Sequence, residues 1–144
     1  MKIFNLKKFI VVSLVMFFLV NCGQEETKEF VETITWSGLS LEVTIKTKYF
    51  DKKINYMIDI EDINKVPIRE TDYYERLKKG KVLIQFMDKD YFEIFTHEIK
   101  INDFSGTVLD GKEIGLVIQK SREIDKLLYS KINKVVLGTK IISN

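Results

Sequence analysis

The single histidine, His97, is the side chain in this sequence best suited to acid–base or nucleophilic chemistry. Such catalysis would need a serine and an orienting acid beside the ring, and no G-x-S-x-G pattern that would supply the serine occurs. His97 falls within an alternating stretch, where a partly buried, hydrogen-bonded ring is the ordinary arrangement. We therefore predict a structural role for His97, with catalysis as the alternative.

Two groups of acidic residues offer the other chemistry, which is calcium binding. They are Asp88, Asp90 and Glu93 at one expected turn, and Asp59, Glu61 and Asp62 at the end of an expected strand. Calcium takes six to eight oxygen ligands, but the EF-hand pattern is absent, and aspartate also favours turns through local hydrogen bonds. We expect ordinary turns, with Asp88 and Asp90 as the alternative metal ligands.

Residue counts exclude several further classes of site. One cysteine forms no internal disulfide, and one cysteine with one histidine does not supply a zinc site. The phosphate-binding patterns GxGxxG and GxxxxGK are both missing. We expect no cofactor and no enzymatic activity.

Residues 1–21 have the charge and hydropathy pattern of a bacterial export signal. Lys2, Lys7 and Lys8 form a basic start without acidic residues, and an apolar run extends from Phe9 to Val20. As a helix this run is about 18 Å long, whereas a hydrocarbon core of about 30 Å needs about 20 apolar residues. The pattern predicts a signal peptide rather than a membrane-spanning helix.

Cys22, the only cysteine, lies two residues after this apolar run. The stretch Leu19-Val20-Asn21-Cys22 resembles the lipobox of bacterial lipoprotein precursors, although a small residue usually stands where Asn21 stands. The resemblance implies cleavage between Asn21 and Cys22 and attachment of acyl chains such as palmitate to Cys22. It also implies a lipid-anchored protein of the cell envelope, at the inner or the outer membrane. The alternative is an incidental thiol beside an uncleaved anchor helix.

Charge in the remaining chain is nearly balanced. The leader holds three of the 23 basic residues and none of the 21 acidic ones, which leaves 20 basic and 21 acidic residues. Interleaved charges of both signs form no basic surface for nucleic acid. We therefore expect the membrane as a partner, through lipid on Cys22, and no nucleic acid.

The chain after the leader divides into a short tether and one domain. Residues 22–29 are polar apart from Cys22 and lack a hydrophobic pattern, so we expect them to link the lipid to the domain. Residues 30–144 are enough for one hydrophobic core, but two separate domains would each be too small.

Alternation of apolar and polar residues predicts a succession of β-strands in this domain. The clearest stretch is residues 39–50, where Leu39, Leu41, Val43, Ile45, Thr47 and Tyr49 share one face. Further strands are expected over residues 30–36, 54–60, 81–88, 91–102, 107–109, 113–119 and 134–142. Turns are expected at Asp51–Lys53, Asp88–Asp90 and Asp110–Gly111.

Three details of this pattern are less regular. Residues 121–130 predict a short helix with Ser121 as N-cap and with Ile124, Leu127 and Leu128 on one side. Residues 67–80 predict an irregular connection with one or two helical turns. A β-bulge near Phe95 and Thr96 would bring the apolar residues of 91–102 onto one face, and Trp36, Phe86, Phe92 and Phe95 are assigned to the core.

The expected fold is mainly β: a single antiparallel β-sandwich with one or two short helices, loosely similar to immunoglobulin or fibronectin type III domains. That similarity rests on the number of strands alone. A small β-barrel is the alternative. No strand precedes a long amphipathic helix, so a doubly wound α/β fold is not expected.

The connection 67–80 contains the candidate partner-binding residues Tyr73, Tyr74 and Arg76, because tyrosine and arginine are common anchors of protein interfaces. The alternative is that one tyrosine caps the core. The sequence thus predicts an envelope lipoprotein that binds a protein or glycan of the envelope or helps to assemble a complex. A small envelope hydrolase and a structural spacer are the alternatives.

Overall fold

A computed structural model describes residues 26–36 and 38–141 of the chain. The predicted signal peptide, the predicted cleavage site between Asn21 and Cys22, and Cys22 itself lie outside the described residues. The strands are β1 (Thr27–Trp36), β2 (Leu39–Phe50), β3 (Lys53–Asp62), β4 (Gly80–Met87), β5 (Glu93–Lys100), β6 (Ser105–Leu109), β7 (Lys112–Glu123) and β8 (Lys134–Ile141). The helices are α2 (Tyr74–Leu77) and α3 (Lys126–Lys131), with 3-10 turns η1 (Ile68–Glu70) and η2 (Ile101–Asp103).

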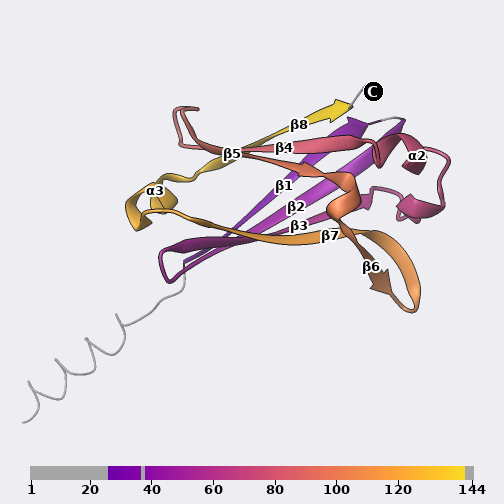
Figure 1. Cartoon of the computed structure of the whole chain (residues 1–144), viewed down its shortest axis with the longest axis horizontal. Coiled ribbons are helices and arrows are strands. Elements are labelled where there is room, and N and C mark those ends of the chain that lie inside the picture. The colour runs from indigo at the N-terminus through magenta and orange to yellow at the C-terminus, as the bar shows by residue number, and fades with distance from the viewer. Residues whose placement is uncertain (1–25, 37, 142–144) are drawn as a thin grey trace, which may run out of the picture.

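Two antiparallel sheets make up the fold (Figure 1). One has five strands in the order β1-β2-β3-β7-β6, and the other has three in the order β5-β4-β8. The mainly β sandwich predicted from the sequence is confirmed, and the described strands form two separate sheets rather than a closed barrel. The likeness to immunoglobulin domains stops at this architecture. Here β3 pairs with β2 in the first sheet, whereas the third immunoglobulin strand lies in the sheet opposite the first two.

The core lies between the inner faces of the two sheets. Leu41, Val43 and Ile45 of β2 are buried, as the alternation of apolar residues predicted, and so are Ile84 and Phe86 of β4. Every second side chain of a strand points to the same face of the sheet. The buried face of each of these strands could therefore be predicted from the sequence alone.

Hairpin turns appear where the sequence predicted them. Asp51 and Lys52 join β2 to β3 with φ of 48° and 59°, and Asp110 and Gly111 join β6 to β7 with φ of 51° and 77°. Two residues of positive φ make the type I′ turn, whose twist matches that of the paired strands. The connection before β4 contains η1 and α2, which confirms the expected helical turns.

The predicted tether is too long at its C-terminal end. Thr27, Lys28 and Glu29 are already part of β1, because they pair with Lys48, Thr47 and Lys46 of β2. Thr27 and Glu29 face solvent, and Lys28, on the inner side, bonds to the end of α3, so polar residues suffice in this part of the strand. The domain therefore begins before residue 30.

The predicted helix over residues 121–130 is wrong in its first half. β7 continues to Glu123, which pairs with Lys53, so Ser121 lies in a strand. The helix begins at Lys126, and Asp125 caps it by accepting a hydrogen bond from the Leu127 amide at 2.7 Å. Leu127 is exposed, and the buried side chain of this helix is Tyr129.

Two assignments in the β4–β5 hairpin also need correction. Phe92 is not in the core, because it lies in the turn and its side chain is 72% exposed. The predicted bulge exists, but Ile94 is the extra residue: Phe86 pairs with Phe95 and Met87 with Glu93. Its place just after the turn leaves Phe95 and Ile99 on the inner face, where both are buried.

Candidate functional site

Tyr73, Tyr74 and Arg76, the predicted binding residues, lie at the start of α2 and within it. Tyr74 packs against the core, and the Arg69 guanidinium lies 5.8 Å from the centre of its ring. Tyr73 is 41% exposed, but its ring covers Gly38, where an added Cβ would lie 2.9 Å from Cε1. Tyr74 is thus a structural residue, and Tyr73 and Arg76 are the parts of this surface that remain available to a partner.

Asp88 and Asp90, the alternative metal ligands, belong to the turn between β4 and β5. One oxygen of Asp88, Oδ1, accepts hydrogen bonds from the amides of Asp90 and Phe92, each at 2.9 Å. This arrangement is the local aspartate turn expected on physical grounds. Among residues 26–36 and 38–141, no three histidine, cysteine or acidic side chains are grouped so that they could hold a metal ion.

The second acidic group is divided among different partners. Asp59 accepts a hydrogen bond from the Thr107 hydroxyl at 3.4 Å, Glu61 pairs with Lys65, and Asp62 accepts from the Asn64 amide at 2.8 Å. Burial, with the Glu61 charge, raises the pKa of Asp59. Glu61 and Asp62 thus hold the turn after β3, whereas Asp59 is bonded across to Thr107 of β6.

His97 lies in β5, partly buried, and its ring is held by Tyr56 of β3. The Tyr56 hydroxyl contacts His97 Nδ1, and the two rings meet edge to face with their centres 5.7 Å apart. The predicted structural role agrees with this geometry. Burial, with the positive charges of Lys120 and Arg122, lowers the pKa of His97 from its ordinary 6.5.

Acidification should therefore weaken the fold through His97. The unfolded chain binds a proton near pH 6.5, whereas the folded chain binds it only at a lower pH, so the free energy of unfolding falls as pH decreases from about 6.5 toward the folded pKa. In His97→Gln this part of the pH dependence should disappear. Urea unfolding midpoints at pH 7.5 and pH 5.5 measure it. Equal pH dependence in both proteins would contradict the assignment.

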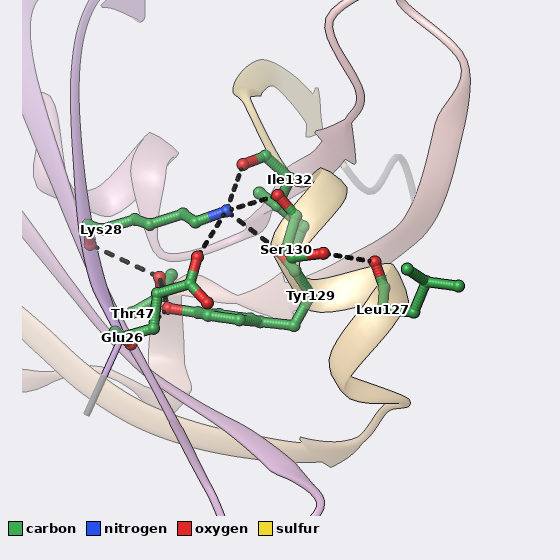
Figure 2. Close-up of polar contacts among 7 residues, drawn as sticks. All are labelled: Glu26, Lys28, Thr47, Leu127, Tyr129, Ser130 and Ile132. Atoms are coloured by element: carbon green, nitrogen blue, oxygen red, sulfur yellow. Dashed lines mark hydrogen bonds and ion pairs between the residues drawn. The ribbon is translucent and has the colours of Figure 1, made fainter. Parts of the chain in front are cut away.

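A partly buried polar centre that the sequence did not predict is built around Lys28 (Figure 2). The Lys28 ammonium group donates to the backbone carbonyls of Tyr129 and Ser130, each at 3.0 Å, and of Ile132 at 2.7 Å. It also lies 3.4 Å from a Glu26 carboxylate oxygen and 4.9 Å from the centre of the Tyr129 ring. These contacts fasten the start of β1 to the end of α3.

Tyr129 extends this centre into the core. Its hydroxyl donates to the Glu26 carbonyl at 2.8 Å and lies 3.1 Å from the hydroxyl oxygen of Thr47, a buried residue of β2. Burial raises the Tyr129 pKa, so the hydroxyl stays protonated and remains a donor. Because three carbonyls surround the Lys28 ammonium group, its hydrogens are all directed at acceptors. The centre is a cap for the helix rather than a nucleophile or a base.

An open groove runs between the edges of the two sheets, where β1 and β8 lie next to each other. Its volume is about 620 Å³, and Phe30, Ile34, Val135 and Leu137 line it together with Glu32. Val135 is buried in the core and the other three apolar side chains are partly buried against it, whereas Glu32 is exposed. Within the described part of the chain, Glu32 has no hydrogen-bond or ion-pair partner. The groove is thus largely apolar and carries two charged side chains, the free Glu32 carboxylate and Lys134, whose ammonium group lies 3.5 Å from the centre of the Tyr91 ring.

A second hollow, of about 740 Å³, lies across the outer face of the five-stranded sheet. Its lining includes Lys46, Asn55, Met57 and Gln119. Two of these side chains contact each other, because Gln119 Nε2 lies 3.9 Å from the Met57 sulfur. Lys48, Lys120 and Glu29 line it as well, and this mixture of charges of both signs with amides and a thioether defines no single ligand. The groove between β1 and β8 is the better candidate for a site.

No family model, no curated protein and no solved structure matches this chain. None of the described helices has the length and apolar character needed to cross a membrane.

Proposed function

We propose that this protein is a lipid-anchored lipoprotein of the bacterial cell envelope whose β-sandwich binds another envelope component. The support for the anchor is the basic leader, the short apolar run and the lone Cys22 after it. Glu26 begins the described chain only four residues after Cys22. The domain would therefore stand directly on the membrane surface.

The observation that supports binding is that the two edge strands beside the groove, β1 and β8, are long and regular. β1 pairs with β2 over ten residues and β8 pairs with β4 over eight, each without a bulge. By contrast, the edge strands β5 and β6 each have an irregular register with their neighbours. Long, regular edges present rows of unpaired backbone groups, which proteins usually interrupt with bulges or cover. A strand from a partner would satisfy them.

Glu32 defines the chemistry of that partner. It points to the same side of β1 as Phe30 and Ile34, so a strand added beside β1 would meet an apolar, an acidic and an apolar position in turn. A free carboxylate on an edge strand penalises pairing with an arbitrary apolar strand. A partner strand with a lysine or arginine between two apolar residues would remove this penalty. We therefore infer an extended segment of that composition as the bound partner.

The hydrolase alternative has less support. It predicts a cleft containing His97, and neither the groove nor the outer hollow is lined by that residue. Tyr73 and Arg76 remain a proposed second contact surface, at the start of α2.

Photo-crosslinking in intact cells tests the binding site. A benzophenone side chain placed at Val31 or at Val136, both exposed beside the groove, should form an adduct of the same mass, and Glu32→Lys should reduce it. Val108, equally free of contacts on the opposite edge, is the control and should form none. No adduct at the groove, or an equal adduct at Val108, would contradict the assignment. With a fourth benzophenone at Tyr73, an adduct at that position alone would move the site to the α2 surface.

A further inference from the structure

One end of the sandwich carries large apolar side chains that the fold leaves in solvent. Phe92 is 72% exposed, Leu127 is 66% exposed and Phe50 is 63% exposed. Tyr91 and Leu128, which neighbour two of them in the sequence, are exposed as well. An exposed group of large apolar residues on a small domain marks a surface that contacts an apolar partner.

These residues come from three connections that the antiparallel topology brings to the same end (Figure 1). Phe50 precedes the β2–β3 turn, Phe92 lies in the β4–β5 turn, and Leu127 lies in α3. The Ile124 amide donates to the Lys52 carbonyl at 3.0 Å, and the Asn133 amide donates to the Met87 carbonyl at 2.9 Å. The chain on both sides of α3 is thereby joined to the two turns.

Hydrogen bonds fix how these side chains are presented. In the β4–β5 turn the Asp88 carboxylate holds the Phe92 amide at 2.9 Å, and Tyr91 has a φ of 66°. In α3, Asp125 caps the first turn while Tyr129 turns inward, so Leu127 points away from the core. A non-glycine residue with positive φ is uncommon. The turn therefore has a specific backbone conformation, and this conformation holds Phe92 in solvent.

The same end is the one at which β1 begins. Three residues lie between Cys22 and Glu26. A chain extends at most about 3.5 Å per residue, so these four steps place Glu26 within roughly 14 Å of the Cys22 backbone. Acyl chains on Cys22 would therefore hold this end, and not the α2 end, next to a lipid surface. β2, with its twelve residues, is about 40 Å long and separates the two ends.

We propose that this end of the sandwich rests on the membrane, with Phe92, Leu127 and Phe50 inserted into the interfacial layer of the lipid. The inference depends on the proposed lipid anchor at Cys22 and adds a second, protein-based contact to it. Lys52, Lys89, Lys126 and Lys131 are exposed at the same end and are placed to meet lipid phosphates. The same connections contain four aspartates that offset these charges, so the proposed contact depends on the apolar side chains: Asp51, Asp88, Asp90 and Asp125.

Fluorescence quenching by brominated lipid tests this contact. The full-length precursor is processed in cells, its Cys22 lipid is verified by mass, and it is reconstituted into vesicles of phosphatidylcholine and phosphatidylglycerol with brominated acyl chains. Phe92→Trp and Leu127→Trp should show blue-shifted emission that the bromines quench. Val108→Trp, at the opposite end and also 63% exposed in the native side chain, is the matched control and should show neither effect. Buried Trp36 gives the same background in every variant.

The outcomes separate the two proposals. Quenching at Phe92→Trp and Leu127→Trp but not at Val108→Trp supports the contact. A lipidated protein whose fluorescence is unquenched at both positions, or equally quenched at all three, overturns the contact and leaves the anchor in place. Protein without lipid on Cys22 overturns the anchor and, with it, this inference.

Discussion

Replacing Cys22 with serine is expected to move the protein from the membrane pellet to the soluble fraction of a bacterial host. The thiol is the nucleophile that accepts the diacylglyceryl group, and a hydroxyl at this position does not replace it. Each buried methylene contributes about 0.8 kcal/mol to membrane binding, and two chains make attachment effectively permanent. The change in partitioning should therefore be nearly complete.

Fractionation followed by immunodetection measures this shift, with incorporation of a labelled fatty acid as the second readout. Asn21→Gly is the matched control, because it brings the sequence before Cys22 to the usual lipobox pattern and should preserve or improve processing. The wild type should be labelled and the serine variant should not. A serine variant that stays in the pellet would indicate an uncleaved anchor helix instead.

Lys28→Met is expected to destabilise the domain by about 2 to 3 kcal/mol, because hydrogen bonds to charged groups contribute about 1.5 to 3 kcal/mol each and some of the freed carbonyls gain water. The ammonium group of Lys28 contacts three carbonyls at 2.7 to 3.0 Å, and its side chain is only 19% exposed. Methionine keeps most of the length of the side chain and removes the hydrogen-bond donors together with the positive charge that faces Glu26 and the Tyr129 ring.

Lys46→Met is the control for this variant. Lys46 lies on the outer face of the same sheet, and its ion pair with Glu29 is long, at 3.9 Å, and exposed. Surface ion pairs of this kind contribute little, so the unfolding midpoint in urea should hardly change. Equal losses in the two variants would show that Lys28 is not the fastening point between β1 and α3.

The strands could be predicted from the sequence where one face of the sheet is buried and the other is wet. Residues 39–50 were bounded correctly because six inward positions alternate with polar ones without a break. β7 was ended too early because Lys120 to Glu123 are polar, and only the pairing of Glu123 with Lys53 keeps this segment extended. The alternation of apolar and polar residues can be recognised within one segment, whereas strand pairing depends on a segment that is distant in the sequence.

The polar centre and the groove could not be predicted in the same way. Lys28 appeared to be one more charge in a polar stretch, although it shares the inward parity of Phe30 and Ile34, which was the available signal. Its carbonyl partners lie more than a hundred residues away. Phe92 was assigned to the core by residue type, but a turn residue has no opposite sheet to pack on. The groove depends on which strands are edges, a property of the whole topology.

Mass spectrometry of the N-terminal peptide, taken from protein purified out of membranes, addresses the anchor most directly. We predict a chain that begins at Cys22 and carries a diacylglyceryl group on the sulfur, with or without a further acyl chain on the amine. Recovery of Met1 to Asn21 still joined to an unmodified Cys22 would contradict the account of a lipid-held sandwich.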